Sequence, residues 1–213
     1  MPVPKREIII LLIILASIAV SLYAYPIVPE QMTSHWNAAG QVNGYIPKLL
    51  GLALMPVISI GAFLLFLVIP RIDPLRRNIA KFRAYFDIFI VMMMLFLLYL
   101  HGVLILANIG FTFNMMQVLA PALGAVFYYS GVLIGHAKKN WSIGIRTPWM
   151  MSSERVWNET HKIGGKLFKA AGIIAFLGIF FPDYAILLIF VPVVAVLVYT
   201  FVYSYVLYQK KRK

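Results

Sequence analysis

Six long apolar blocks separated by polar segments make up most of this sequence. A helix needs about 20 apolar residues to cross a bilayer, and most of the blocks reach or approach that length. The blocks cover residues 7–25, 49–70, 87–108, 117–136, 166–181 and 184–208. The pattern therefore predicts an all-α membrane protein with six transmembrane helices.

The composition agrees with a multi-pass protein of the cell membrane. Hydrophobic residues make up 62% of the 213 positions and charged residues only 12%, whereas soluble domains carry about 25% charge. The first block has an alternative reading as a secretory signal peptide, because Lys5 and Arg6 precede it and Ala19-Val20-Ser21 could be cleaved. We favour a retained helix, because the apolar run continues to Tyr25.

The basic residues predict the orientation of the six helices. If the N-terminus is cytoplasmic, every Lys and Arg except Lys48 falls on the cytoplasmic side, as the positive-inside rule requires. Both termini are then cytoplasmic, residues 26–48 form the outer loop and residues 137–165 form an inner loop. We expect the net charge of +12 to reflect this orientation and contact with anionic lipid through residues 71–83, and we expect no direct nucleic-acid binding.

The inner loop contains the longest polar segment, Trp141–Gly165. Thr147-Pro148 is typical of a helix start, with a hydroxyl cap followed by proline at the first helical position. Residues 148–162 then fit an amphipathic helix, and Gly164-Gly165 predicts its end. We expect this interfacial helix to lie on the membrane surface between the fourth and fifth transmembrane helices.

The outer loop carries two turn signals. Asn37-Ala38-Ala39-Gly40 and Val42-Asn43-Gly44 both end in a glycine, which accepts a positive φ at no steric cost. We therefore expect a polar loop with two turns.

Enzyme signatures are missing from the sequence, which has no cysteine. No zinc-protease, serine-hydrolase, phosphate-loop or dinucleotide motif is present, so we expect no catalytic residue, no cofactor and no metal. His35 with Glu30 is the alternative that would make the protein an enzyme. His101 is the only ionisable residue deep in a predicted span, and we expect it to bond to a neighbouring helix. The lack of a deep carboxylate argues against an ion-driven pump.

A small transporter or channel-like protein remains the alternative function. Pro56, Pro121 and Pro192 lie in the outer halves of the second, fourth and sixth predicted helices. Proline is common in membrane helices, but three kinks could together shape a shallow pocket that faces outward.

Two segments resemble known families. Pro29-Glu30 and the run Ser34–Tyr45 resemble the outer-loop signature of the membrane domain DUF1648. Ile143–Trp149, followed by Glu154, Trp157 and His161, resembles the inner-loop signature of the SdpI family. The resemblance implies a DUF1648-like helical hairpin over residues 1–70 and an SdpI-like four-helix membrane domain over residues 71–213.

The resemblance also implies a function without catalysis. The best-known member of the family is a bacterial immunity protein that protects against a secreted killing peptide and holds a transcriptional repressor at the membrane. By analogy, the outer loop contacts the peptide through Glu30, His35, Trp36, Asn37, Gly40 and Gly44. The inner loop engages the repressor through Ile143, Gly144, Ile145, Arg146, Thr147, Pro148, Trp149, Glu154 and Trp157.

Overall fold

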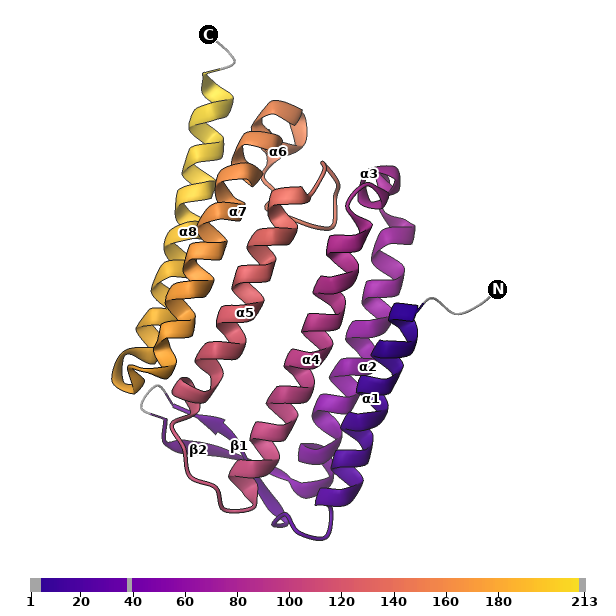
Figure 1. Cartoon of the computed structure of the whole chain (residues 1–213), viewed down its shortest axis with the longest axis vertical. Helices are drawn as coiled ribbons and strands as arrows, with labels where there is room; N and C mark the ends of the chain where they lie inside the picture. Colours follow the sequence, from indigo (N-terminus) through magenta and orange to yellow (C-terminus); the bar gives the residue numbers. More distant parts are fainter. Residues whose placement is uncertain (1–4, 38–39, 211–213) are drawn as a thin grey trace.

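The computed structural model describes residues 5–37 and 40–210, which form an elongated helical bundle with a small β-hairpin at one end (Figure 1). The long helices are α1 (Lys5–Ala24), α2 (Lys48–Ile72), α4 (Arg83–Asn108), α5 (Met115–His136), α7 (Glu154–Phe176) and α8 (Ala185–Gln209). The short elements are β1 (Gln31–Trp36), β2 (Val42–Pro47), α3 (Arg76–Ala80), α6 (Pro148–Ser152), and the 3-10 turns η1 (Leu177–Ile179) and η2 (Pro182–Tyr184).

Five of the long helices can cross a membrane by their length and composition. These are α1, α2, α4, α5 and the stretch that ends in α8. Their outward faces are strongly apolar, with Leu187 and Val198 of α8 more than half exposed, as expected where lipid is the solvent. The sixth long helix, α7, runs alongside α5 and α8 (Figure 1) but carries several charged residues in its first half.

The predicted interfacial helix over residues 148–162 is wrong in its continuity and in its end. The chain forms the single turn of α6, breaks at Ser153 and continues as α7 without interruption through Gly164 and Gly165. The Ser153 hydroxyl accepts a hydrogen bond from the Val156 N–H at 3.5 Å and so begins a new helix. The glycine pair therefore lies inside a long helix and does not end one.

The glycines of α7 bring its backbone against α5. A Cβ added to Gly165 would lie 2.8 Å from the Gly131 carbonyl oxygen, and one added to Gly172 would lie 2.6 Å from the Gly124 carbonyl oxygen. Both pairs of glycines repeat at seven residues, which keeps them on one helix face. Small residues with this spacing allow membrane helices to approach closely, so the glycines determine the α5–α7 packing.

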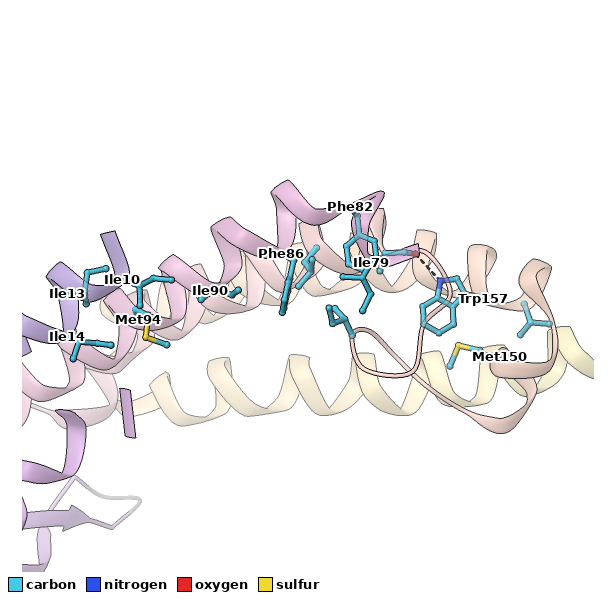
Figure 2. Close-up of a cluster of buried hydrophobic side chains, with 14 residues drawn as sticks. Ile10, Ile13, Ile14, Ile79, Phe82, Phe86, Ile90, Met94, Met150 and Trp157 are labelled. Carbon is cyan, nitrogen blue, oxygen red and sulfur yellow. Dashed lines mark hydrogen bonds between the residues drawn. The ribbon is translucent and has the colours of Figure 1, made fainter. Parts of the chain in front are cut away.

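The long helices form two groups that meet along the middle of the bundle. Helices α1, α2 and α4 form one group, and α5, α7 and α8 form the other (Figure 1). A continuous apolar core connects them at the end opposite the hairpin. Figure 2 shows this core running from Ile10 on α1, past Phe86 on α4, to Met150 and Trp157 beside the inner loop.

The outer loop is a β-hairpin, which the all-α prediction lacked. Strands β1 and β2 pair antiparallel, with Gln31 opposite Pro47 and Trp36 opposite Val42. The first predicted turn is confirmed at Gly40, whose φ is +75°. The second is wrong, because Gly44 lies within β2, where a Cβ would approach the Cβ of His35 to 2.9 Å. Gly44 serves cross-strand packing rather than a reversal of the chain.

Candidate functional site

The inner-loop signature forms a compact unit at the end of the bundle where α5 ends and α7 begins. The predicted helix start is confirmed. Thr147 caps α6 by accepting a hydrogen bond from the Met150 N–H at 3.3 Å, and Pro148 occupies the first turn. Thr147 and Met150 are buried, so this cap also fixes the loop against the core.

A buried asparagine shapes the turn before the signature. The side chain of Asn140 donates to the carbonyls of Lys138 and Ile143 at 2.8 and 2.9 Å. Its Oδ1 accepts from the N–H groups of Ser142 and Ile143 at 2.8 and 2.6 Å. Sequence reasoning missed Asn140, although an asparagine followed closely by serine and glycine is a known turn signal.

Gly144 fits where no other residue would. Its φ is +116°, and an added Cβ would lie 2.5 Å from Nε2 of His161. The same Nε2 accepts a hydrogen bond from the Ile145 N–H at 3.2 Å. The Trp157 carbonyl lies 2.9 Å from Nδ1 of His161, so Nδ1 carries the proton and donates it to that bond. The backbone around Gly144 thereby selects one neutral tautomer of His161.

Burial holds His161 in this neutral form. The side chain is 2% exposed and lies outside the five candidate spans. Desolvation lowers its pKa to about 4, and the hydrogen bond to the Trp157 carbonyl only partly opposes the change. The Trp157 ring stacks on the imidazole at 3.9 Å between centroids. His161 is therefore an uncharged structural group at neutral pH.

Two tryptophans anchor the unit to neighbouring helices. Trp157 is fully buried, and its indole N–H donates to the Ala137 carbonyl at 2.9 Å, which closes the loop between α5 and α7 (Figure 2). Trp149 donates to the Ser204 hydroxyl of α8 at 2.5 Å and packs edge-on against Phe201. These contacts explain two of the signature positions by packing alone.

The other half of the bundle holds the same loop through Asp73, which sequence reasoning missed. Asp73 follows α2 and is 3% exposed. Its carboxylate accepts hydrogen bonds from the Leu75 N–H at 2.7 Å, the Trp141 N–H at 3.0 Å and the Ser142 hydroxyl at 2.6 Å. Asn78 of α3 also donates to the Lys139 carbonyl at 2.8 Å. The Arg71–Arg83 segment thus braces the inner loop.

The predicted partner-binding residues differ in how far they are exposed. Ile143, Thr147 and Trp157 are buried, and Gly144, Ile145 and Trp149 are partly buried. The exposed members are Arg146, Pro148 and Glu154. Arg146 donates to the Trp141 carbonyl, which holds its guanidinium near the surface of the unit.

A mostly apolar cavity of about 470 Å³ lies beneath this unit, between the two groups of helices. Phe66 and Phe89 line it from α2 and α4, Phe168 and Leu197 line it from α7 and α8, and Ser142–Arg146 form its loop wall. The signature loop therefore lies between the two helix groups, so a movement of one group relative to the other would displace the loop.

The hairpin places the outer candidate residues at the opposite end of the bundle. Nδ1 of His35 lies 2.5 Å from Oδ1 of Asn43 on the facing strand. Glu30 is 87% exposed at its side chain and pairs with Lys48 at 2.8 Å. Glu30 and His35 therefore each have a partner of their own.

The remaining outer candidates lie on or beside the same hairpin. Trp36 packs against a buried cluster that includes Val28 and Met32, and it is only partly buried. Asn37 and Gly40 form the hairpin turn, joined by a hydrogen bond from the Gly40 N–H to the Asn37 carbonyl at 2.9 Å. The hairpin docks on α4, where Asn108 exchanges hydrogen bonds with the Thr33 backbone at 2.7 and 3.1 Å.

Within the membrane-spanning part, His101 behaves as predicted. Its Nε2 lies 2.8 Å from the Ser21 hydroxyl of α1, and this hydroxyl also reaches the Leu52 carbonyl of α2 at 2.8 Å. His101 thus joins α4 to both neighbouring helices. Among residues 5–37 and 40–210, no group of three or more His, Asp or Glu could hold a metal ion.

The three prolines lie inside α2, α5 and α8, as the sequence places them. An apolar cavity of about 310 Å³ beside Pro56 is lined by α1 and α2 and includes neither Pro121 nor Pro192. This cavity does not unite the three prolines in one pocket.

Two stretches of the chain match known protein families. Residues 136–204 match the SdpI/YfhL protein family, and residues 12–60 match the domain of unknown function DUF1648. Immunity protein SdpI of Bacillus subtilis (strain 168) is 28% identical over 207 residues, which cover 97% of each chain. The chain thus resembles an SdpI-family membrane protein over nearly its whole length. No solved structure matches it.

The similarity to SdpI and the five apolar helices together support a multi-pass membrane protein. The SdpI match covers the inner-loop unit, α7 and most of α8. The DUF1648 match covers α1 from Leu12 onward, the hairpin and the first half of α2.

Proposed function

We propose that this SdpI-like protein is an immunity and signalling protein that binds a toxic peptide outside the cell and a transcriptional repressor inside. The observation that carries the proposal is the separation of the two signature segments. The hairpin with Glu30 and His35 lies at one end of the bundle, and the loop with Arg146 lies at the other (Figure 1). One end can therefore contact the peptide while the other contacts a cytoplasmic partner.

In this proposal residues 166–181, which begin in the second half of α7, form the sixth crossing, and both termini are cytoplasmic. This stretch is shorter than the five candidate spans, and the residues of α7 directly before it lengthen the apolar helix, while His161 lies nearer the inner loop. The charged side chains of α7 all lie between Glu154 and Lys169, toward the end of the helix at the inner loop. An even number of crossings keeps the basic segments on the cytoplasmic side.

The outer surface offers the chemistry to hold a peptide. Glu30 and His35 are exposed, and Tyr45 on strand β2 of the same hairpin is 65% exposed. Exposed backbone on β2 would also allow an extended peptide to pair with the edge of the hairpin. Trp36, Asn37, Gly40 and Gly44 shape the hairpin that presents these groups.

The inner surface would engage the repressor through its exposed residues. Arg146, Pro148 and Glu154 project from the signature unit, and charged side chains on a fixed backbone give specificity for a partner. The buried members of the signature keep this surface in shape. Signalling then requires that peptide binding favours one arrangement of the two helix groups, because a ligand acts only through states that it binds differently.

A protection assay tests the proposed function. The chain is expressed in a Bacillus subtilis strain that lacks SdpI, and the cells are exposed to the killing peptide. We expect survival with the intact chain and loss of survival when His35 and Glu30 are both replaced by alanine. Protein level in the membrane fraction must be equal for the two. Full killing of cells that express the intact chain would contradict immunity, and solute uptake by the purified protein in vesicles would favour a transporter.

The orientation is tested separately with single cysteines, since the sequence has none of its own. Gln41→Cys places a thiol on the exposed hairpin and Ser152→Cys places one on the exposed end of α6. We expect an impermeant thiol reagent to label the first in intact cells and the second only after the cells are broken. The reverse result would contradict the proposed orientation.

A further inference from the structure

Five arginines surround one open pocket of about 780 Å³ at the inner end of the first helix group. Arg6 comes from α1, Arg71 from the end of α2, Arg76 and Arg77 from α3, and Arg83 from the start of α4. Residues from four elements thus turn guanidinium groups toward one space. Neither the immunity function nor the family signatures use these residues.

The negative charge in the pocket is too small to balance them. Asp87 is the only acidic residue among the lining residues. It pairs with Arg6 and with Arg83, the latter at 2.6 Å, and Arg6 also lies 3.5 Å from Glu7. Arg71 donates to the Leu67 carbonyl of its own helix. The described residues give no ion pair to Arg71, Arg76 or Arg77.

The unpaired guanidinium groups line the same open pocket, so their positive charges repel one another. An anion bound between them would relieve that repulsion. A guanidinium fork matches the oxygen atoms of a phosphate in a bidentate fashion and remains charged at any physiological pH. The number and type of these residues therefore favour a phosphate over a small halide or a single carboxylate.

Apolar residues complete the wall of the pocket. Leu67 and Pro70 of α2 and Ile79 and Ala80 of α3 line it beside the arginines. The pocket adjoins the ends of two candidate spans, since α2 ends at Ile72 and α4 begins at Arg83. A ligand that joins a phosphate to an apolar group would satisfy both kinds of wall.

We propose that this arginine pocket binds a phosphate group at the inner membrane boundary, in an anionic phospholipid headgroup or as free phosphate. The proposal differs from general attraction of a basic surface to lipid, because it assigns binding to a defined cavity with one saturable site. Arg76 and Arg77 are its central residues, because both are exposed and lack ion pairs with the described residues.

The pocket also touches the element that braces the signature loop. Arg76 and Arg77 lie on α3 beside Asn78, which donates to the Lys139 carbonyl at 2.8 Å. A phosphate held by the two arginines would stabilise α3 and, through Asn78, the inner loop. Thermal stability of the purified protein is therefore a direct readout of binding.

Three double variants separate the pocket from the basic surface around it. Arg76→Gln with Arg77→Gln removes two charges from the pocket. Lys138→Gln with Lys139→Gln removes two charges from the same end of the bundle but outside the pocket. The lysine pair is the matched control. At Lys138 and Lys139 the loop is held by hydrogen bonds to the backbone carbonyls, which the substitutions retain. Arg76→Lys with Arg77→Lys retains the charge and loses the fork.

The measurement is the shift in unfolding temperature of the full chain in neutral detergent as each probe is titrated. The probes are phosphatidylglycerol, a diacylglycerol with the same chains, and inorganic phosphate. We expect saturable stabilisation by phosphatidylglycerol, inorganic phosphate or both, and none by diacylglycerol. The arginine-to-glutamine pair should weaken binding by about tenfold or more, the arginine-to-lysine pair by less, and the lysine pair should bind as the wild type does.

The probes identify the source of the phosphate. Stabilisation by phosphatidylglycerol alone supports a lipid headgroup, and equal stabilisation by inorganic phosphate supports free phosphate. Equal weakening in the arginine and lysine double variants would overturn the proposal in favour of a diffuse basic surface. Absence of any phosphate-dependent stabilisation in the wild type would overturn it as well.

Discussion

The carboxylate of Asp73, at the end of α2, accepts a hydrogen bond from the backbone N–H of Trp141 at 3.0 Å across 68 residues of sequence. This contact joins the first helix group to the loop that carries the family signature. Because the same oxygen accepts the Ser142 hydroxyl at 2.6 Å, one buried carboxylate fixes the start of the loop.

Replacing Asp73 by alanine should loosen this loop more than any change at its exposed residues. The substitution leaves the N–H of Trp141 and the hydroxyl of Ser142 without their acceptor in a partly buried place, a loss of about 2 kcal/mol in the free energy of unfolding. Limited proteolysis between Ala137 and Thr147, with thermal unfolding in detergent, measures it. Ser142→Ala removes only one of the bonds and should cost less, and an equal cost for the two would contradict this view of Asp73.

Gly144→Ala should disrupt the signature unit. The backbone at Gly144 has a φ of +116°, which disfavours any side chain, and the new Cβ would strike Nε2 of His161. We expect a loss of at least about 2 kcal/mol. The matched control is Gly102→Ala, because a Cβ at Gly102 meets nothing within 4 Å. Unchanged unfolding temperature in Gly144→Ala would show that the loop has another conformation in the membrane.

Gly172→Ala should separate α5 from α7. Its Cβ would lie 2.6 Å from the Gly124 carbonyl oxygen, and two packed helix backbones cannot yield locally. We predict reduced yield of folded protein and a lower unfolding temperature in detergent. Gly102→Ala again serves as the control and should be neutral or slightly stabilising, since alanine favours a helix. Wild-type stability in Gly172→Ala would contradict the close α5–α7 contact.

Stability should fall with acid because of His161. The pKa of its imidazole is lowered to about 4 by burial, against an ordinary value of about 6.5 in the unfolded chain. The unfolded state therefore takes up a proton first as pH falls. The contribution of His161 to the free energy of unfolding is therefore complete above pH 6.5. It decreases by about 3 kcal/mol in total as the pH falls from about 6.5 to 4.

The pH dependence is measured as the free energy of unfolding between pH 7.5 and pH 4. The control is His161→Gln, which cannot take up the proton and should show a flatter profile over that interval. If the two profiles are parallel, His161 is not the group responsible.

Arg146→Ala should uncouple signalling from immunity. Arg146 is exposed and makes one hydrogen bond, to the Trp141 carbonyl, so its loss should change stability by less than about 1 kcal/mol. If the proposed function holds, repressor recruitment is lost while toxin protection persists. Arg155→Ala removes an equal charge from an exposed position on α7 and should leave both intact. Loss of both activities in Arg146→Ala, at normal protein level, would count against two separate faces.

Hydrophobic spacing was enough to predict the helical architecture. The five apolar helices, the start of α6 at Thr147-Pro148 and the turn at Gly40 could all be predicted, because each depends on the residues within a few positions. The roles of the other glycine residues could not be predicted from the residues next to them in sequence. Gly164-Gly165 and Gly44 are typical of chain breaks in sequence, but they lie in a helix and a strand because a neighbouring element approaches there.

The sequence likewise predicted one part of the candidate site, and the tertiary structure decided the rest. The sequence by itself determined which segment carries the signature and that membrane-crossing helices surround it, because apolar length and local caps are written into consecutive residues. Only the tertiary structure decided that Thr147 and Trp157 are buried supports while Arg146 and Glu154 face outward. It also brought Asp73 to Trp141 and gathered five arginines around one pocket. Such contacts join residues far apart in the chain, and no local pattern encodes which distant backbone they will meet.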